Sequence, residues 1–427
     1  MRLMCEKIKI DKDLQAIANI FKKAGFSLYL VGGALRDRYL NRENYDIDVA
    51  TDALPEEVSH LFKKTIPTGI EHGTVTIRFR GKNIECTTLR REEGYTDSRH
   101  PDKVVYGSSI IEDLSRRDFT MNAMAASLPD GSLFDPYNGR LDIKASLIRA
   151  VGDPLKRFSE DGLRPMRAIR FAGQLGFEIE NETLKAIGLS LNRVSKVSVE
   201  RIQEEFNKIL KAKYTNKSLN LLKETGVFSV FLPEIIEIEN EDFELLISQI
   251  SNIPREKFDL RLTLIFSYIY EKEKSIEKII KILKQLKYSN KIVESVSHLV
   301  KVYNFDENLL NTQAKIRNFL KNVGKDYIND ALILKKALVE SSSLSSFYNI
   351  EKIEKEIKTI IEEKHPLSLK ELDINGNDLL ANGFETGASL GSTLKTLLDV
   401  VLENPNKNKK DELLKIAKNW QKLEVYN

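Results

Sequence analysis

Two aspartates, Asp46 and Asp48, stand one residue apart in the segment YDIDVAT and could bind divalent metal ions. On a β-strand, residues i and i+2 face the same side, roughly 6.6 Å apart along the backbone. Both carboxylates can therefore point to one place, and carboxylate oxygen is a ligand that Mg²⁺ prefers. The pair suits metal ions that hold a nucleoside triphosphate, although an Asp-x-Asp pair is more often a solvated strand end.

A phosphate-binding turn is predicted shortly before this pair. The apolar run Leu28–Val31 predicts a buried strand, and Gly32 and Gly33 follow it directly. These glycines open a helix that carries Arg36. A glycine turn at a helix N-terminus brings backbone N–H groups close to a phosphate, and the helix dipole favours negative charge there. A Gly-Gly pair is often a plain tight turn, but its position before the two aspartates favours a nucleotide site.

The strings GGALRD and YDIDVAT resemble the signature of the class II tRNA nucleotidyltransferases, the CCA-adding enzymes, and of the related bacterial poly(A) polymerases. Both belong to the polymerase-beta-like nucleotidyltransferase superfamily. The resemblance implies an α+β N-terminal head with a small β-sheet, followed by neck, body and tail domains that are all helical. It also implies Mg²⁺ as the cofactor, and CTP, ATP and the 3′ end of tRNA as partners.

A third carboxylate, Glu85, is expected beside the aspartate pair. Apolar and polar residues alternate in HGTVTIRF, and residues 82–89 are rich in β-branched side chains, which predicts neighbouring strands joined across Gly81. Glu85 then lies on a strand beside that of Asp46 and Asp48. It is either a carboxylate near the metal ions or the partner of a neighbouring arginine. The strings HGTVTIRF and ECTTLR resemble the CCA-adding branch of the family more than the poly(A) polymerase branch.

The segment Arg90–Ser109 is polar, contains glycine and proline and shows no clear period, which predicts a loop. It resembles the flexible loop of CCA-adding and A-adding enzymes. The string RRDFT then matches another block of the family, and by this resemblance Arg117 contacts the nucleotide. Adjacent arginines donate forked hydrogen bonds to phosphate or ribose oxygens. Alternatively, Asp118 pairs with Arg116 or Arg117 at the surface.

Asp161 and Arg164 could read the edge of a nucleobase. The segment RFSEDGLRPMRAIRFAGQLGF predicts one helix with Ser159 as its N-cap, so these two side chains share a face. Cytosine and adenine present an amino group beside an unprotonated ring nitrogen. The Asp161 carboxylate would accept from the amino group, and the Arg164 guanidinium would donate to the ring nitrogen. Uracil and guanine would leave both side chains unpaired, which supports strong discrimination.

The family uses this EDxxR motif as its amino-acid template, and by resemblance Arg167 and Arg170 also contact the nucleotide. Helical periodicity turns Arg170 nearly opposite Asp161, which makes its assignment the weaker one. Pro165 departs from the family pattern, and past the first turn it would kink the helix and shift Arg164. The competing interpretation of the motif is a surface ion pair between residues three apart, worth about 0.2–0.5 kcal/mol.

Composition restricts the class of protein. The chain has 427 residues, 41% hydrophobic and 30% charged, which indicates a globular protein of roughly two to four domains. A net charge of +3 gives no general argument for nucleic-acid binding. Two cysteines without paired spacing predict neither a zinc site nor a disulfide framework. The charged N-terminus and the lack of a long apolar run predict a cytoplasmic protein without membrane contact.

Four domains are predicted, in chain order. They are a nucleotidyltransferase head at residues 1–152, a helical neck for base recognition at 153–213, a helical body at 214–305 and a helical tail for tRNA binding at 306–427. The neck includes VSVERIQEEFNKIL, an amphipathic helix that resembles the last conserved block of the family. The sequence leaves the oligomeric state open between monomer and dimer.

The predicted reaction is template-independent addition of CCA to the 3′ end of tRNA by two-metal catalysis. Asp161 and Arg164 would choose the base, while Gly33, Arg36 and Arg117 would bind the triphosphate and the sugar. Two alternatives share these motifs: an A-adding enzyme that acts on tRNA ending in CC, and a poly(A) polymerase, whose usual basic C-terminal extension is not seen. The intact aspartate pair disfavours a third alternative, a catalytically silent RNA-binding protein.

Overall fold

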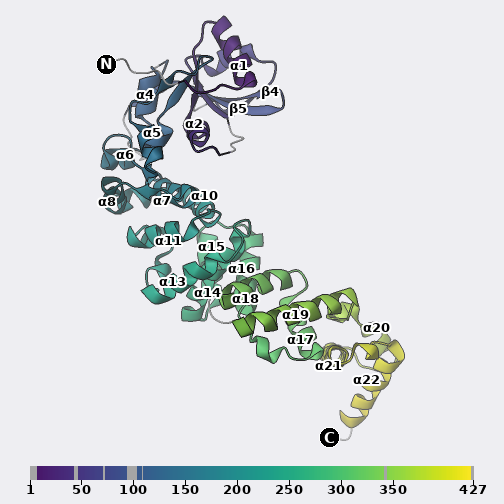
Figure 1. The fold of residues 1–427 in the computed structure, drawn as a ribbon. Helices are drawn as coiled ribbons and strands as arrows, with labels where there is room; N and C mark the ends of the chain where they lie inside the picture. Colours follow the sequence, from purple (N-terminus) through teal and green to yellow (C-terminus); the bar gives the residue numbers. More distant parts are fainter. Residues whose placement is uncertain are drawn as a thin grey trace. The chain divides into compact units, whose positions relative to one another are not determined.

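The computed structural model describes residues 7–42, 47–70, 73–93, 103–107, 109–340 and 344–424. The chain forms two compact units, Met1–Ile238 and Glu239–Asn427 (Figure 1). The first unit combines a β-sheet with helices, and the described part of the second is built of helices. The predicted α+β head followed by helical parts is therefore confirmed. The domain boundaries expected after residues 152, 213 and 305 stay predictions.

The first unit is organised around a seven-stranded mixed sheet with the strand order β3-β4-β5-β2-β1-β8-β9. Its strands are β1 (Leu28–Val31), β2 (Ile47–Thr51), β3 (Thr65–Gly69), β4 (Thr74–Phe79), β5 (Lys82–Thr88), β8 (Ala125–Leu128) and β9 (Leu133–Phe134). β2 pairs in parallel with β5, and this register places Asp48 opposite Glu85. β4 and β5 form an antiparallel hairpin across Gly81, whose φ of +79° favours glycine. The predicted strands around Glu85 are therefore confirmed.

Helix α1 (Lys12–Lys23) packs against β1 and β8 because its apolar residues recur every three or four positions. Its N-cap is Asp11, whose carboxylate accepts a hydrogen bond from the N–H of Leu14 at 3.0 Å. Leu14, Ile17 and Phe21 are fully buried. Each such side chain contributes about 1.5–3 kcal/mol to stability by leaving water, so the helix fixes one face of the sheet.

The prediction of a loop at Arg90–Ser109 is wrong at both ends of the segment. β6 (Arg90–Glu93) and β7 (Lys103–Tyr106) form an antiparallel two-stranded ribbon, in which Arg90 is paired with Tyr106. The ribbon is separate from the main sheet, so its strands do not require the apolar and polar alternation by which strands are recognised. Residues 94–102 and 108 of the predicted loop lie outside the described part of the chain.

The segment expected to form one helix around Asp161 forms two. α6 (Pro154–Glu160) ends before Asp161, which has extended backbone angles of φ −141° and ψ 109°. α7 (Arg164–Leu175) then begins at the residue before Pro165. Proline is tolerated in a first helical turn, where its missing N–H has no helical partner to lose. The expectation that Pro165 kinks the helix is therefore wrong.

Shorter elements connect the sheet to the helical part of the first unit, where η marks a 3₁₀ helix. They are α2 (Gly32–Tyr39), α3 (Pro55–Leu61), α4 (Ile110–Ser115), η2 (Thr120–Asn122), α5 (Gly139–Lys144), β10 (Leu147–Ile148), β11 (Glu178–Ile179), α8 (Asn181–Leu189), α9 (Leu191–Val194), α10 (Val199–Leu210), α11 (Thr215–Glu224), α12 (Phe228–Phe231) and η3 (Pro233–Ile235). The helix predicted to begin at the glycine pair is α2, and the amphipathic helix of the neck is α10.

The second unit contains the remaining helices. They are α13 (Asn240–Ser251), α14 (Phe258–Glu273), α15 (Ile276–Gln285), α16 (Asn290–Val302), η4 (Glu307–Leu309), α17 (Gln313–Val323), α18 (Ile328–Glu340), α19 (Leu344–Glu362), η5 (Leu369–Glu371), α20 (Gly376–Leu380), α21 (Ala388–Glu403), η6 (Pro405–Lys407) and α22 (Lys410–Glu424). A buried ion pair of 3.0 Å joins Lys335 to Glu307 within it. Among the described helices, none is both long and apolar enough to cross a lipid bilayer.

Candidate active site

A cavity of about 860 Å³ lies in the first unit, lined by β1, β2, β5, α2, α7, α10 and the chain after α4. Eight basic side chains and five carboxylates line it, so its field attracts an anion such as a triphosphate. The lining residues are Val31, Gly32, Gly33, Arg36, Asp37, Asp48, Val49, Glu85, Thr87, Arg116, Arg117, Asp118, Asn122, Asp161, Leu163, Arg164, Arg167, Arg170, Phe171, Arg201 and Lys208. The cavity thus gathers every predicted site residue that the structure describes, while Asp46 lies outside the described residues.

Asp48 and Glu85 stand on adjacent parallel strands, and both line the cavity. Within the described ranges, no arginine forms an ion pair with Glu85. The same ranges contain no group of three or more His, Cys, Asp or Glu side chains that could hold a metal ion. Asp48 and Glu85 nevertheless supply carboxylate oxygens side by side, the donor chemistry that Mg²⁺ requires.

Gly32 allows two charged groups to approach the start of α2. Its φ is +66°, a conformation that strains residues with a Cβ atom. A Cβ atom at this position would lie 3.1 Å from Nη1 of Arg117 and 3.4 Å from Oδ2 of Asp48. The glycine therefore leaves room for a guanidinium and a carboxylate at the helix N-terminus.

Gly32→Ala is expected to lower nucleotide incorporation at least about tenfold, because its methyl group presses on Arg117 and contacts Asp48. Backbone strain adds about 1–2 kcal/mol of destabilisation. Gly152→Ala is the matched control, since Gly152 has a φ of +71° and open space around the position of its Cβ atom. Incorporation rates and thermal midpoints of both variants check the prediction. An equal loss of activity in both would show that contact with Arg117 and Asp48 is not the cause.

One buried carboxylate, Asp113 of α4, holds both Arg116 and Arg117. Nη2 of Arg116 lies 2.7 Å from one oxygen of Asp113, and Nη2 of Arg117 lies 3.1 Å from the other. Burial raises the pKa of Asp113, but the two guanidinium groups outweigh this effect and hold the pKa below its usual value. The alternative in which Asp118 pairs with one of these arginines at the surface is wrong.

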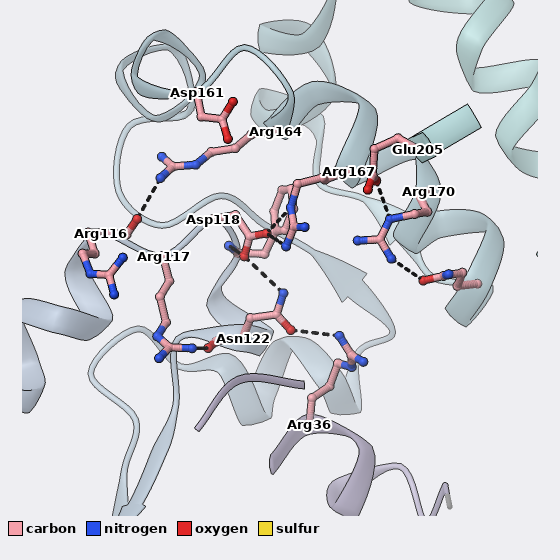
Figure 2. Close-up of polar contacts among 12 residues, drawn as sticks. Arg36, Arg116, Arg117, Asp118, Asn122, Asp161, Arg164, Arg167, Arg170 and Glu205 are labelled. Carbon is pink, nitrogen blue, oxygen red and sulfur yellow. Dashed lines mark hydrogen bonds and ion pairs between the residues drawn. The ribbon is translucent and has the colours of Figure 1, made fainter. Parts of the chain in front are cut away.

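Asp118 is buried and instead pairs with Arg167 of α7 (Figure 2). Nε and Nη2 of Arg167 lie 2.9 and 2.6 Å from Oδ2 of Asp118. Oδ1 accepts from the N–H of Phe119 at 2.8 Å and from Nδ2 of Asn122 at 3.1 Å. Burial alone would raise the pKa of Asp118, but the charge of Arg167 and these hydrogen bonds hold the pKa well below its usual value.

Asp118→Asn is expected to lower the thermal midpoint by several degrees at pH 7, because Arg167 loses its charged partner. The folded-state pKa of Asp118 is lowered, so its contribution to stability is complete above the unfolded value near 3.8 and is lost as the pH falls below it. The difference in midpoint between the two proteins should therefore stay constant from pH 7 to about pH 5 and shrink below about pH 4. Circular dichroism measures it. A difference that grows on acidification would contradict the assignment.

Asp161 and Arg164 line the same cavity but pair with other residues. Nη1 and Nη2 of Arg201 in α10 lie 3.1 and 2.9 Å from the two oxygens of Asp161. Arg164 is buried, and it donates to the Glu160 carboxylate at 2.6 Å and to the carbonyl oxygen of Arg116 at 2.9 Å (Figure 2). The placement of both residues on one helix is wrong, and the surface ion pair of the alternative interpretation does not form. The cavity still brings the two side chains together.

The connection between α6 and α7 holds Asp161 in place. The N–H of Leu163 donates to Oδ1 of Asp161 at 3.0 Å. Gly162 lies between them, and a Cβ atom there would come within 2.3 Å of the carbonyl oxygen of Arg193. The connection therefore passes against a neighbouring segment so closely that only glycine fits without movement of the backbone.

Arg170 also lines the cavity, although periodicity placed it nearly opposite Asp161. That expectation measured the angle from Asp161, which lies outside α7. Nε of Arg170 is 2.6 Å from the carboxylate of Glu205 in α10, and its guanidinium lies 4.0 Å from the centre of the Phe171 ring. The first contact is an ion pair and the second a cation–π interaction, so Arg170 is held from two sides.

Sequence reasoning missed several polar residues of the cavity wall or its immediate support, among them Asn122, Arg201, Glu205 and Lys208. Three of them belong to α10, which was interpreted as an amphipathic helix of the neck with no residue assigned to the site. The available signal was that Arg201 and Glu205 lie four residues apart beside the buried apolar face of this helix. Asn122 carried no signal beyond its place after RRDFT.

Three family models match successive parts of the chain. Residues 28–149 match the "Poly A polymerase head domain", residues 176–238 match the "Probable RNA and SrmB- binding site of polymerase A", and residues 263–417 match "tRNA nucleotidyltransferase domain 2 putative". The first match covers the sheet and the glycine turn, and the others cover helices. A sheet with paired carboxylates beside a glycine turn, followed by helices, thus defines an RNA nucleotidyltransferase.

Relatives extend over nearly the whole chain. The CCA-adding enzyme of Pediococcus pentosaceus is 34% identical over 414 residues, which cover 96% of this chain and 98% of the relative. That of Lactobacillus helveticus is 36% identical over 423 residues, with the same coverage of 96% and 98%. The crystal structure of the Bacillus stearothermophilus CCA-adding enzyme in complex with CTP is similar with a TM-score of 0.78 and 28% identity, and covers 97% of this chain and 98% of that one. The chain belongs to the family of CCA-adding enzymes, which are tRNA nucleotidyltransferases.

Proposed function

We propose that the protein adds C, C and A in turn to the 3′ end of tRNA from CTP and ATP, without a nucleic-acid template. The observation that carries this proposal is that Asp161 and Arg164 line one cavity together with Asp48 and Gly32. In each step the 3′-hydroxyl oxygen of the tRNA bonds to the α-phosphorus of the nucleotide. The bond from that phosphorus to the β-phosphate oxygen breaks, and pyrophosphate leaves.

The glycine turn and two arginines bind the triphosphate and sugar. Backbone N–H groups at Gly32 and Gly33 begin α2, where the helix dipole favours a phosphate. Arg36 and Arg117 line the cavity beside them and donate forked hydrogen bonds to phosphate and ribose oxygens. Because Asp113 and Asn122 hold these guanidinium groups, they are oriented before the nucleotide arrives.

The carboxylates on the two neighbouring strands fit Mg²⁺. Asp48 and Glu85 offer oxygen donors on neighbouring strands, and Asp46 belongs to the same aspartate pair. When bound there, the metal lowers the pKa of the attacking hydroxyl and stabilises the leaving oxygen. Asp46 and Asp48 are the residues to which we assign metal binding, with Glu85 as the third carboxylate of the site.

Asp161 and Arg164 select the base, and Arg167 and Arg170 complete the wall of the base site. A carboxylate has about four lone-pair positions, so Asp161 keeps capacity for a base amino group while it binds Arg201. The Arg164 guanidinium donates to the ring nitrogen of cytosine or adenine. Uracil and guanine would instead face the Asp161 carboxylate with an acceptor and the Arg164 guanidinium with a donor, at a cost of about 1–3 kcal/mol for each group.

The test is incorporation of nucleotides on three tRNA transcripts, which end before CCA, after C and after CC. Each transcript receives Mg²⁺ with CTP, ATP, UTP or GTP alone, and then CTP with ATP. We expect stepwise completion to CCA and no use of UTP or GTP. Addition of A to the CC-ended transcript alone would make the protein an A-adding enzyme, and long A tails would make it a poly(A) polymerase. Both outcomes would overturn the proposal.

A further inference from the structure

Asn122 joins two parts of the cavity that the proposed reaction uses separately. Its Oδ1 accepts a hydrogen bond from Nη1 of Arg36 at 2.9 Å, and its Nδ2 donates to Oδ1 of Asp118 at 3.1 Å (Figure 2). The side chain is buried, with 7% of its surface exposed. A guanidinium only donates and a carboxylate only accepts, so these two partners fix the orientation of the amide.

The hydrogen-bond network of Asn122 continues into α7, where Arg167 and Arg36 also contact the same aromatic ring. Asp118 holds Arg167 through two hydrogen bonds of 2.9 and 2.6 Å. The guanidinium groups of Arg36 and Arg167 lie 5.2 and 5.5 Å from the centre of the same Phe171 ring. Arg36 and Arg167 are thus connected twice, once through polar groups and once through an aromatic ring.

We propose that Asn122 is a positioning residue that couples the triphosphate end of the site, at Arg36, to the base end, at Arg167. This inference rests on the proposed function. An amide is required because Arg36 needs a hydrogen-bond acceptor while Asp118 needs a donor. When a bound phosphate shifts the guanidinium of Arg36, the hydrogen bonds of Asn122 and Asp118 transmit this displacement to Arg167. Base selection therefore depends on a correctly bound triphosphate.

Asn122→Asp breaks this coupling on one side. The carboxylate still accepts from Arg36 but faces Asp118 with a second negative charge instead of a donor. We expect KM for CTP to change less than about threefold, while the ratio of kcat/KM for CTP to that for UTP falls about tenfold or more. Asn122→Ser removes both bonds without adding charge, so KM for CTP should rise and the ratio should also fall. Asn192→Asp, at an exposed position of α9, is the control and should change neither.

The outcomes separate the coupling from the proposed function. If the unaltered protein incorporates neither CTP nor ATP, the proposed function fails. If the unaltered protein incorporates CTP and ATP, but both Asn122 variants lower kcat/KM for CTP and UTP by equal factors, Asn122 has only a structural role. The coupling is then refuted. Thermal midpoints are measured for each variant, and Asn122→Ser carries the test if Asn122→Asp does not fold. A fall in the ratio of kcat/KM for CTP to that for UTP in a folded variant supports the coupling.

Discussion

Asp48→Ala is expected to reduce nucleotide incorporation at least about 1,000-fold, the largest effect of any single replacement in this chain. Asp48 faces the cavity next to Gly32 and opposite Glu85, where its carboxylate is an oxygen donor for Mg²⁺. Alanine leaves no donor, and it also leaves the guanidinium of Arg117 near a site that has lost a negative charge. Single-turnover incorporation of labelled CTP on a tRNA transcript that ends before CCA measures the loss.

Binding of tRNA should remain within about threefold of normal in this variant, because the replacement leaves intact the helical tail that we propose to bind tRNA. Asp52→Ala is the matched control. Asp52 follows the same strand, accepts a hydrogen bond from the N–H of Ser27 at 2.8 Å and does not line the cavity. Its activity should stay near normal. Activity that survives in Asp48→Ala would remove the metal assignment from this strand.

Asp161→Asn is expected to lower the discrimination between CTP and UTP about 100-fold. A carboxylate only accepts hydrogen bonds, whereas an amide also donates, so O4 of uracil gains a partner that Asp161 denies it. The same change weakens the hold of Arg201, since a neutral amide replaces its charged partner. The values of kcat/KM for CTP and UTP, measured on a transcript that ends before CCA, give the ratio.

Asp153→Asn is the control for this change. Asp153 begins α6, the helix that ends before Asp161, and accepts a hydrogen bond from the N–H of Lys156 at 2.9 Å outside the cavity. Its discrimination should equal that of the unaltered protein. If Asp161→Asn also keeps full discrimination while it remains active, base selection does not involve Asp161, and the remaining arginines of the cavity become the candidates.

Short-range patterns predicted the phosphate end of the site. A strand that runs into Gly32 and Gly33 gives α2 its start, and alternation in β4 with the β-branched residues of β5 predicts the hairpin that carries Glu85. Both features depend on residues close in sequence, whose periodicity and φ requirements are local. The strands of the separate β6–β7 ribbon lack such a pattern, and they were predicted as loop for that reason.

Long-range pairing of charges was not predictable from one sequence. Asp118 has two arginines beside it in the chain, but it pairs with Arg167, 49 positions away. Asp161 pairs with Arg201, 40 positions away. The ion pairs of this site depend on which opposite charges the fold brings together out of water. The helical spacing of residues near Asp161 does not predict that α10 packs beside it. Arg170 was predicted to contact the nucleotide, and helical spacing weakened that assignment only because Asp161 was placed on the same helix.

The three-residue link from Asp161 to Leu163 limits which insertions and deletions this chain can tolerate. Two anchors, Arg201 and the N–H of Leu163, hold the carboxylate, and Gly162 presses the link against the carbonyl of Arg193. Adding or deleting one residue there would shift the carboxylate by about 3.3–3.6 Å, beyond hydrogen-bond reach, while both helices stayed intact. Exposed positions on α6, such as Lys156, are therefore free to vary, whereas insertions and deletions in the link are not. The base selection that we propose for Asp161 therefore depends on the length of this link.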